Sequence, residues 1–585
     1  MDQDVIVQRA KEYIASEEHQ FFRSQVEELL SSNSFDELSD RFYTELEFGT
    51  GGLRGVIGGG FNRLNPYTVQ KATQGLANYV NRACGAGVGS VVIAYDSRNF
   101  SDVFALEAAK VLCANGIKTF LFSSLRPTPE LSFAVRMLKA TAGIVVTASH
   151  NPPEYNGYKA YWSDGAQMVA PQDKDVIAEV RAVEGRPRTI SKDAAIGQGL
   201  LSIIDREVDD AFIAMVKGCA IRPGLMKQHG GDFKVVFTPL HGTGAMPVER
   251  ALREMGVEVL FVPEQKEPDG NFPTVAYPNP EEASAMKLAL ELAGKEEASL
   301  VIGTDPDADR LGIAAPDDGE LKLVTGNQLG ALIEDYMLGA RREAGTLPEK
   351  AVFIKTIVTT ELQRRIAASY GADCIDVLTG FKYIGEKIRE FEQQPDGPVY
   401  IAGGEESYGY LVNTEVRDKD AVSAATMAVE LALYYKVNGK TLFDRLRELW
   451  FEHGYFQEIQ ISKNFRGQSG VATMQALMER LRTTPPKMLG DKTVVTIRDY
   501  ANGTTTDAAT GAVVNDINLP SSNVLQLVCE DDSVVTARPS GTEPKIKFYA
   551  SCCSKPRMPF DTAQREVQDK IAIITSAIND LISGA

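Results

Sequence analysis

The sequence predicts an α/β protein in which three related α/β domains with mixed sheets, plus a smaller C-terminal α+β domain, surround a central cleft. Short apolar runs alternate with segments of helical spacing, and this rhythm starts three times along the chain. Continuous apolar runs separated by helices are typical of parallel or mixed sheets that are covered on both faces. After about residue 456 the strand-like runs cluster together before one last helix, which is typical of an α+β domain.

Length and composition set the scale of the protein. The chain has 585 residues, which corresponds to about four domains at roughly 150 residues each. It is 44% hydrophobic and 24% charged, which excludes a collagen-like chain, a coiled-coil rod or a mainly disordered protein. The predicted division is an N-terminal helical extension (1–45), α/β domain I (46–205), α/β domain II (206–325), α/β domain III (326–455) and α+β domain IV (456–585).

The elements of each domain are predicted from the apolar runs in chain order. The first 45 residues are charged and helical in pattern. In domain I a helix over 104–112 is predicted to have Ser101 as its N-cap and to stop at Gly116. Further helices are predicted over 246–255 and 562–582. The predicted strands are 90–95, 119–122 and 144–146 in domain I, 234–237, 257–262 and 299–302 in domain II, 351–354, 374–378 and 399–402 in domain III, and 494–497, 524–528, 534–537 and 546–549 in domain IV.

Charge and cysteine usage limit the partners and the compartment. The formal net charge is −18, which disfavours nucleic acid and anionic membranes because both require clustered positive charge. No apolar run approaches the about 20 residues that a bilayer needs, and the acidic N-terminus lacks the pattern of a signal peptide. The seven Cys are scattered without a C-x-x-C pair, and there are only five His. We therefore expect a reduced, cytoplasmic protein without disulfides or a zinc site.

The first candidate site loop is TASHNPP, residues 147–153, which follows the predicted strand 144–146. In doubly wound sheets, ligands bind beyond the carboxyl ends of the strands. Ser149 is therefore a candidate nucleophile, and the alternative is a polar turn. His150 is disfavoured as its base, because neighbouring residues on an extended segment point apart. A serine that carries a phosphoryl group would need cations instead, and Lys159 is a candidate.

The second loop is GTDPDADR, residues 303–310, which follows the predicted strand 299–302. Asp305, Asp307 and Asp309 offer three carboxylates in one short loop, the oxygen ligands that Mg²⁺ prefers. An EF-hand is excluded, because the loop lacks Gly at its sixth position and Glu at its twelfth. The remaining alternative is a solvated acidic turn.

Three further loops carry weaker signals, and each alone could be a Gly- or Pro-rich turn. In GGEESYG, residues 403–409, Glu405 and Ser407 could bind sugar hydroxyls. The FGTGGLRG stretch, residues 48–55, is not a dinucleotide fingerprint, but Arg54 could reach a phosphate. In RPSGTEPK, residues 538–545, a phosphate cradle is predicted from Arg538, Ser540, Gly541, Thr542 and Lys545.

Together, these five stretches resemble the α-D-phosphohexomutase superfamily. The resemblance spans about residues 48 to 550, with the motifs in the expected order. The FGTGGLRG start, the DPDADR loop and the length are similar to the long-form phosphoglucomutase/phosphopentomutase branch. The usual loop has Gly where this chain has Pro306, but the three ligand positions are kept.

The resemblance implies a role for each loop. Ser149 would be the phosphorylated serine, and the three Asp would bind Mg²⁺ with a phosphate oxygen of that serine. Members of the superfamily can have a second acid/base His after the sugar loop, but here no His lies between His241 and His453, so that role is unassigned and Lys419 is a candidate. The catalytic candidates are Ser149, Lys159, Arg54 and His150, and the substrate-binding candidates are Arg310, Thr379, Gly380, Lys382, Glu405, Ser407, Arg538, Ser540, Gly541, Thr542 and Lys545.

The implied activity is interconversion of glucose 1-phosphate and glucose 6-phosphate through a phosphoserine enzyme. Mg²⁺ and a sugar 1,6-bisphosphate, as activator and intermediate, would be the cofactors, and the partner would be a small-molecule sugar phosphate. Phosphopentomutase or phosphomannomutase activity, or a non-catalytic sugar-phosphate sensor, remains open, as does a monomer or a homodimer. We also expect a basic cleft within an acidic molecule, because several basic residues lie on the candidate site loops: Arg54, Lys159, Arg310, Lys382, Arg538 and Lys545.

Overall fold

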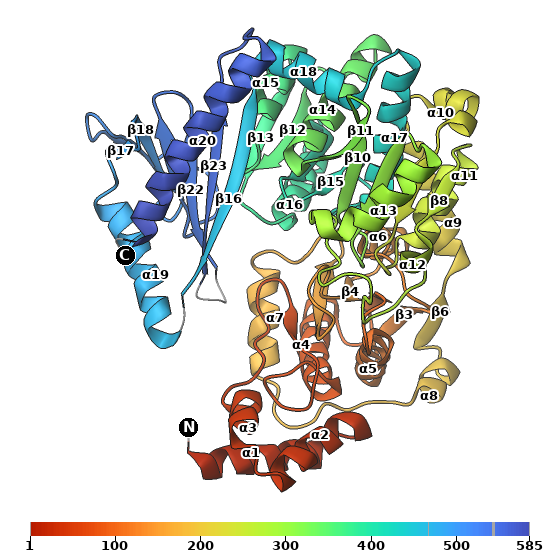
Figure 1. Ribbon diagram of the computed structural model, residues 1–585. Coiled ribbons are helices and arrows are strands. Elements are labelled where there is room, and N and C mark those ends of the chain that lie inside the picture. Colours follow the sequence, from red (N-terminus) through yellow and green to blue (C-terminus); the bar gives the residue numbers. More distant parts are fainter. Residues whose placement is uncertain (1, 466, 541–544, 584–585) are drawn as a thin grey trace.

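The computed structural model describes residues 2–465, 467–540 and 545–583, and the predicted fold class is confirmed. Three α/β units with mixed sheets follow one another along the chain, and a β-rich unit with two long helices ends it (Figure 1). In the described residues, no helix has both the length and the apolar character needed to cross a bilayer. All seven cysteines are free thiols, as predicted.

The N-terminal extension consists of three helices that form a separate layer below domain I (Figure 1). Tyr13 lies at its centre, edge-on to Phe42 and Phe61 at ring distances of 5.9 and 5.6 Å. The helices are α1 (Gln3–Ser16), α2 (Gln20–Ser31) and α3 (Phe35–Phe42).

Domain I contains a six-stranded sheet in the order β1-β5-β4-β2-β3-β6, in which β1 and β5 are antiparallel to their neighbours. The predicted N-cap was wrong. The helix begins at Ser101 itself, whose hydroxyl instead donates to Asp96, while Phe100 occupies the cap position with φ 64°. Gly116, with φ 75°, follows the end of the helix as predicted. The elements are β1 (Leu53–Val56), α4 (Pro66–Cys84), β2 (Ser90–Tyr95), α5 (Ser101–Ala114), β3 (Lys118–Phe122), α6 (Thr128–Met137), β4 (Ala142–Val146), β5 (Tyr155–Trp162), α7 (Gln172–Arg181), α8 (Lys192–Gly197) and β6 (Leu201–Ile204).

Domain II has a five-stranded sheet in the order β11-β10-β9-β7-β8. The three apolar strands β7, β8 and β9 are parallel, and a β10–β11 hairpin extends the sheet antiparallel to β9. The elements are α9 (Arg206–Gly218), α10 (Pro223–His229), the 3₁₀ turn η1 (Gly230–Asp232), β7 (Val235–Thr238), α11 (Ala245–Glu254), β8 (Val259–Phe261), α12 (Pro263–Lys266), α13 (Ala283–Glu296), β9 (Leu300–Thr304), β10 (Leu311–Asp317) and β11 (Glu320–Val324).

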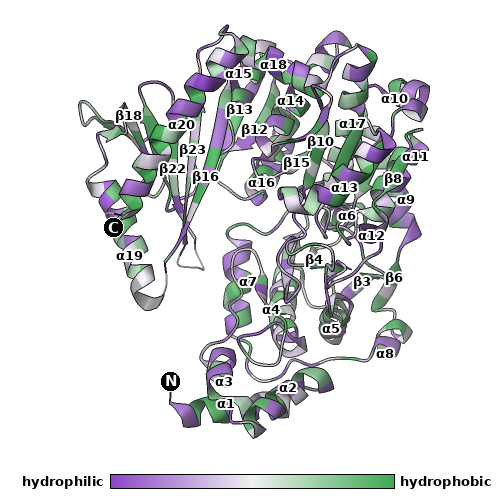
Figure 2. Cartoon of the chain, viewed as in Figure 1, coloured by the Kyte–Doolittle hydropathy of each residue, from purple (hydrophilic) through white to green (hydrophobic). Residues whose placement is uncertain are grey.

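Domain III has a four-stranded sheet in the order β13-β12-β14-β15. Its helix α17 is buried along almost its whole length and packs on α9, α10 and α11 of domain II, so these two domains share one hydrophobic core. Hydrophobic residues colour β10 and much of α17 green in Figure 2. The elements are α14 (Gly326–Glu343), β12 (Ala351–Thr356), α15 (Leu362–Tyr370), β13 (Asp373–Val377), α16 (Lys382–Glu392), β14 (Val399–Glu405), β15 (Gly409–Leu411), α17 (Ala421–Val437) and α18 (Leu442–His453).

Domain IV is an antiparallel sheet that lies to one side of domain III, in blue in Figure 1. Its last helix places Val567, Ile571, Ile574 and Ile578 on one face, at the spacing of a helix that packs on a sheet. The domain boundaries themselves stay a prediction, because α9 packs on both domain I and domain II. The elements are β16 (Phe456–Asn464), α19 (Gly467–Thr483), β17 (Met488–Leu489), β18 (Lys492–Asp499), β19 (Thr504–Asp507), β20 (Val513–Val514), β21 (Leu525–Cys529), β22 (Val534–Pro539), β23 (Lys545–Cys553) and α20 (Phe560–Ser583).

Candidate active site

The serine loop and the acidic loop, predicted from different domains, meet in space. Ser149 follows β4, and its hydroxyl donates to Oδ2 of Asp305, which follows β9, at 2.6 Å. Both side chains are buried. Ser149 has the left-handed conformation, with φ 53°, and its N–H donates to the Thr147 hydroxyl at 2.8 Å. A non-glycine residue in this conformation is strained, and such strain is typical of functional sites.

His150 lies closer to the serine than we predicted. Its Nδ1 is 3.1 Å from the Ser149 hydroxyl, although neighbours on an extended strand would point apart. The left-handed turn at Ser149 breaks the alternation and brings the two side chains together. Burial, followed by the charge of Arg310, lowers the pKa of His150 well below its usual value, so the imidazole is neutral near pH 7.

The acidic loop has the composition of a site for a hard cation. Asp305, Asp307 and Asp309 are buried, and one carboxylate oxygen from each lies within 4.8 Å of the others. Asp305 Oδ1 accepts from the backbone N–H groups of Asp309 and Arg310 at 3.0 and 2.9 Å. The Oδ1 atoms of Asp307 and Asp309 are buried without a hydrogen-bond partner. Since a buried, unpaired carboxylate oxygen is costly, these atoms fit a divalent metal.

Two lysines compensate part of the negative charge of this cluster. Lys159 Nζ on β5 lies 3.0 Å from Asp307 Oδ2 and 3.5 Å from Asp309 Oδ2. Lys419 Nζ, from the loop before α17, lies 3.0 Å from Asp309 Oδ2. Burial lowers the pKa of both lysines, but the carboxylates outweigh it and raise both values above the usual range. Both lysines are therefore protonated donors at the acidic loop.

The pKa values of Asp305 and Asp307 are shifted in opposite directions. Burial, followed by repulsion from Asp307 and Asp309, raises the pKa of Asp305 well above its usual value. Burial acts in the same direction on Asp307, but Lys159 and a hydrogen bond to Asp305 hold its pKa below the usual range. When no metal is bound and Asp305 and Asp307 share one proton, that proton is therefore bound to Asp305.

Thr128, at the start of α6, is part of the site and was missed by the sequence reasoning. Its hydroxyl donates to Asp307 Oδ2 at 2.8 Å, and its N–H donates to the Asp307 carbonyl at 2.9 Å. The Thr128-Pro129 pair marks the start of a helix, but it does not indicate which loop that helix faces. The contact joins domain I to the acidic loop of domain II.

Arg310 and Arg54, the two arginines predicted near the transferring group, lie beside the acidic loop and the serine loop but have different contacts. Arg310 forms an ion pair with Glu281 and pairs with Gly409 through an isolated backbone bridge, which connects the acidic loop to the 403–409 loop. Arg54 lies on β1, opposite Gly157 of β5, and its charge contributes to the lowered pKa of His150. Both positions are within electrostatic reach of the serine loop.

The loops predicted to contact the sugar come together at the end of the domain III sheet. Glu405 Oε1 accepts from the Gly380 N–H at 2.9 Å, which joins the 403–409 loop to the loop that holds Thr379. Lys382, at the start of α16, lies 3.7 Å from Asp173 of domain I. The Tyr408 carbonyl accepts from the N–H of Leu311, directly after the acidic loop, at 3.0 Å.

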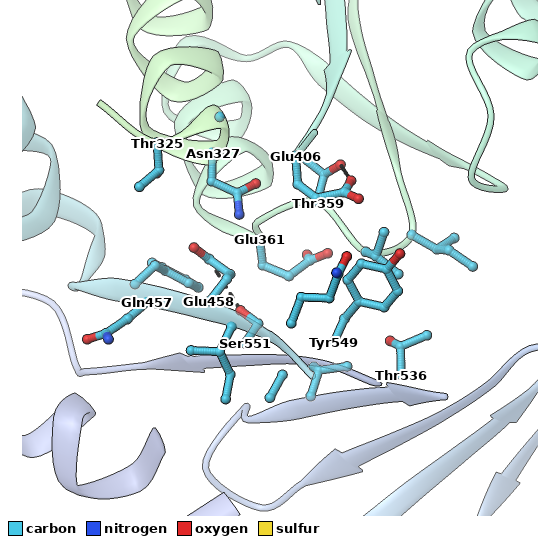
Figure 3. Close-up of a pocket in the computed structure, with 18 of the residues that line it drawn as sticks. Thr325, Asn327, Thr359, Glu361, Glu406, Gln457, Glu458, Thr536, Tyr549 and Ser551 are labelled. Atoms are coloured by element: carbon cyan, nitrogen blue, oxygen red, sulfur yellow. Dashed lines mark hydrogen bonds between the residues drawn. The ribbon is translucent and has the colours of Figure 1, made fainter. Parts of the chain in front are cut away.

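Ser407 and its neighbours also line a cavity of about 510 Å³ between domains III and IV. Figure 3 shows Glu406 and Glu361 of domain III facing Glu458 and Tyr549 of domain IV across it. The Glu406 carboxylate accepts from the hydroxyls of Thr356 and Thr359, both at 3.2 Å. Burial, followed by repulsion from Glu405, raises the pKa of Glu406 to about 7.

The predicted phosphate cradle of domain IV is described only in part. Gly541 and Thr542 lie outside the described residues, while the Ser540 N–H donates to the Lys545 carbonyl at 2.7 Å. Lys547, which we had not singled out, pairs in register with Arg538 on the neighbouring strand. Burial, followed by repulsion from Lys545 and Arg538, lowers the pKa of Lys547. Strand periodicity could have found it, since residues 545 and 547 share one face.

Comparison with known proteins shows the family. Three family models, described as phosphoglucomutase/phosphomannomutase alpha/beta/alpha domains I, II and III, match residues 45–186, 210–319 and 325–453. The chain belongs to this family. The phosphoglucomutase of Staphylococcus epidermidis is 37% identical over 554 residues, which cover 94% of this chain and 97% of that protein. The phosphoglucomutase of Staphylococcus haemolyticus is 38% identical over 516 residues, covering 87% and 91%.

Solved structures of phosphoglucomutase/phosphomannomutase relatives show the same fold. A putative phosphomannomutase from Thermus thermophilus has a TM-score of 0.64 at 22% identity and covers 90% of this chain and 99% of its own. The open form of Paramecium parafusin, a phosphoglucomutase, has a TM-score of 0.69 at 16% identity, covering 92% and 96%. The predicted superfamily and the predicted enzyme class, a phosphohexomutase of the isomerase class, are confirmed by the family models and the curated relatives. Family and acidic cluster together support a divalent metal and a sugar-phosphate substrate.

Proposed function

We propose that the chain is a phosphoglucomutase that interconverts glucose 1-phosphate and glucose 6-phosphate. The observation that carries the proposal is the position of the Ser149 hydroxyl, 2.6 Å from Asp305 within a cluster of three buried carboxylates. Relatives of 36–38% identity over nearly the whole chain carry the name phosphoglucomutase, which supports glucose as the sugar. The buried serine, the acidic cluster and two protonated lysines suit phosphoryl transfer, in which positioning and charge neutralisation do most of the work.

In this proposal Ser149 carries the phosphoryl group. Its P–Oγ bond breaks as a sugar hydroxyl oxygen forms a new bond to phosphorus, the hydroxyl proton leaves, and Oγ regains a proton. His150 Nδ1 and Asp305 are hydrogen-bond partners of Oγ, and Lys159 and Lys419 hold protons at Asp307 and Asp309 of the same cluster. Asp305, Asp307 and Asp309 would hold Mg²⁺, which supplies charge neutralisation at the transferring oxygens when bound.

The intermediate is a sugar 1,6-bisphosphate, which also serves as the activator that phosphorylates the serine. It turns around in the cleft and returns its other phosphate to Ser149. Glu405 and Ser407, with the loop that contains Thr379, Gly380 and Lys382, are proposed to bind the sugar hydroxyls. The distal phosphate is proposed to bind Arg538, Ser540, Gly541, Thr542 and Lys545, with Lys547 beside them, while Arg54 and Arg310 flank the transferring group.

A direct assay tests the proposal. The protein is incubated with glucose 1-phosphate, Mg²⁺ and a trace of glucose 1,6-bisphosphate, and glucose 6-phosphate is followed by a coupled dehydrogenase. We expect steady turnover that stops with a chelator. Absence of turnover on every hexose and pentose 1-phosphate would exclude the mutase proposal and would favour a sugar-phosphate sensor, which intact mass without a phosphoryl adduct would support.

Phosphomannomutase is the second candidate, because the matched family models carry both names. Phosphopentomutase activity also remains open within the proposal. The ratio of kcat/KM across glucose, mannose and ribose 1-phosphates decides between them, and we expect glucose to be highest. We further propose a cytoplasmic location with a small-molecule sugar phosphate, rather than nucleic acid or a membrane, as the partner.

A further inference from the structure

Arg98 is a fully buried arginine behind the serine loop. It follows β2, and the side chain is 0% exposed. Its two terminal nitrogens donate to four backbone carbonyls of the segment that begins at Ser149. The acceptors are the carbonyls of Ser149 at 2.6 Å, Pro152 at 2.8 Å, Tyr155 at 2.9 Å and Asn151.

Three of these four carbonyls belong to the segment before β5, and the fourth belongs to Tyr155, the first residue of β5; the Pro152 carbonyl also accepts from the Tyr155 N–H at 3.1 Å. The segment between β4 and β5 runs outside the sheet ladder, and Ser149 has the left-handed φ of 53°. A buried carbonyl without a partner costs free energy comparable to a lost hydrogen bond. One planar guanidinium with five donors can satisfy several carbonyls at once, whereas a lysine ammonium is a single point on a flexible stem. Arg98 therefore holds the shape of the serine loop from inside.

The other face of Arg98 contacts domain II. The Phe272 ring centre lies 4.9 Å from its guanidinium carbon, and Asn99 Nδ2 donates to Asn271 Oδ1 at 3.0 Å. The fit is close, because a Cβ atom at Gly270 would lie 2.5 Å from the Asn99 nitrogen. The loop after β2 is thus packed between the serine loop and residues 269–272.

Residues 269–272 are in turn connected to the acidic loop. The Asp269 N–H donates to the His241 carbonyl at 3.2 Å, and the Thr243 N–H donates to the Pro306 carbonyl at 2.8 Å. Pro306 lies between the carboxylates at 305 and 307. A continuous series of contacts therefore joins the serine loop, Arg98, residues 269–272, residues 241–243 and the acidic loop.

We propose that Arg98 is a positioning residue that sets the distance between the Ser149 hydroxyl and the acidic loop. The inference rests on the proposed function, because it concerns the serine that the mutase reaction uses. The side-chain hydrogen bonds of Arg98 go to backbone carbonyls of residues 149–155, and its guanidinium also lies 3.5 Å from the buried Asp96 carboxylate. Arg98→Lys keeps a positive charge for Asp96, so its main effect is expected on the segment that begins at Ser149. Misplacing a reacting group by about 1 Å costs roughly 100-fold in rate. Binding of the sugar, which uses loops of domains III and IV, is unaffected.

The test is Arg98→Lys, with Arg445→Lys as its matched control. Arg445 is a half-buried arginine of α18 that donates to both oxygens of Asp335 at 2.8 Å, within the domain III core. We expect Arg98→Lys to lower kcat about 100-fold while KM for the sugar 1-phosphate stays within about threefold. Arg445→Lys should lose thermal stability without this loss of kcat. Transfer of phosphate from glucose 1,6-bisphosphate to Ser149, followed by intact mass, should slow in parallel with kcat.

The measurements distinguish failure of the proposed function from failure of the proposed role of Arg98. An inactive wild-type protein overturns the proposed function, whereas an active wild type and an equally active Arg98→Lys overturn the role of Arg98. A rise in KM equal to the fall in kcat/KM also overturns it, since positioning should act on kcat. If Arg98→Lys does not fold, Phe272→Leu replaces it, because it removes only the ring on the outer face of the guanidinium. A fall in kcat of threefold or more at unchanged KM supports the inference, and unchanged kcat overturns it.

Discussion

Two carboxyl groups on the cavity between domains III and IV have pKa values shifted in opposite directions, and only one of them is expected to make stability depend on pH between about 5.5 and 8. Burial and Glu405 raise the pKa of Glu406 from 4.5 to about 7. Burial also acts against ionisation of Glu361, but Lys355 and Arg364 lower its pKa to about 2. Both side chains face the same cavity (Figure 3), so Glu361 is a control for Glu406.

The sign follows from proton binding. Because the folded-state pKa of Glu406 is raised, the native state binds its proton more tightly than the unfolded chain, and the free energy of unfolding falls as pH rises from 4.5 toward 7. One pKa unit corresponds to about 1.4 kcal/mol, so the full cost above that range is at most about 3.5 kcal/mol. Residual solvent exposure of the side chain reduces this value. Glu406→Gln keeps an acceptor for Thr356 and Thr359 but cannot ionise.

The experiment compares melting temperatures of wild type, Glu406→Gln and Glu361→Gln at about pH 5.5 and about pH 8. We expect Glu406→Gln to gain several degrees relative to wild type at the higher pH and little at the lower. Glu361 is ionised throughout this interval in both folded and unfolded chains, so Glu361→Gln should lose about the same stability at both pH values. If the difference between Glu406→Gln and wild type does not change with pH while the control behaves as described, the pKa of Glu406 is ordinary and the reasoning is wrong.

Three further predictions concern the proposed chemistry. Ser149→Ala should lose more than about 1,000-fold in kcat with an unchanged melting temperature, and near-normal turnover would remove the serine from the mechanism. In Mg²⁺ at a hundredfold excess over its Kd, the free energy of unfolding of the wild type should rise by about 2.7 kcal/mol, and that of Asp307→Asn should rise much less in the same thermal melt. An equal rise in both proteins would contradict the metal site. Lys547→Gln should raise KM for glucose 1-phosphate about tenfold, because a hydrogen bond to a charged group is worth about 1.5 kcal/mol or more. Lys570→Gln on α20 is the control variant. Equal KM values in the two variants would exclude a contact between Lys547 and the phosphate.

Strands that carry a continuous apolar run could be predicted from sequence, whereas strands of mixed composition could not. The apolar run at residues 90–95 coincides with β2, and that at 144–146 lies within β4, because both strands are buried on both faces. No such run marks β5, which carries Lys159 and pairs antiparallel with β4. Its sequence mixes aromatic, charged and glycine residues. The same holds for the short β1 and β15, whose pairing depends on the neighbouring strand rather than on their own pattern.

The contact between Ser149 and Asp305 could be predicted from the sequence, since both residues follow buried strands whose carboxyl ends face one cleft. The proximity of His150 was not, because it depends on a left-handed residue that is not glycine. Thr128 and Lys419 were not predictable as neighbours of the acidic loop, since each reaches it across a domain boundary. Periodicity and spacing describe one element at a time, and these contacts depend on how whole domains pack.

The charges of the site residues differ from the uniformly basic cleft that we predicted. They also differ between domains I to III and domain IV. In domains I to III, four of the site cations each lie within ion-pair distance of a carboxylate, so these four do not make this part of the cleft basic. In domain IV, among the residues that the structure describes, Arg538, Lys545 and Lys547 have no carboxylate within ion-pair distance, and repulsion contributes to the lowered pKa of Lys547. A cluster of like charges of this kind is stabilised when an anion binds. If the proposed function holds, the distal phosphate binds in domain IV and the chemical step takes place at the compensated cluster, so we expect added salt to weaken binding more than it slows the chemical step. The compensated pairs are Lys159 with Asp307, Lys419 with Asp309, Arg310 with Glu281 and Lys382 with Asp173.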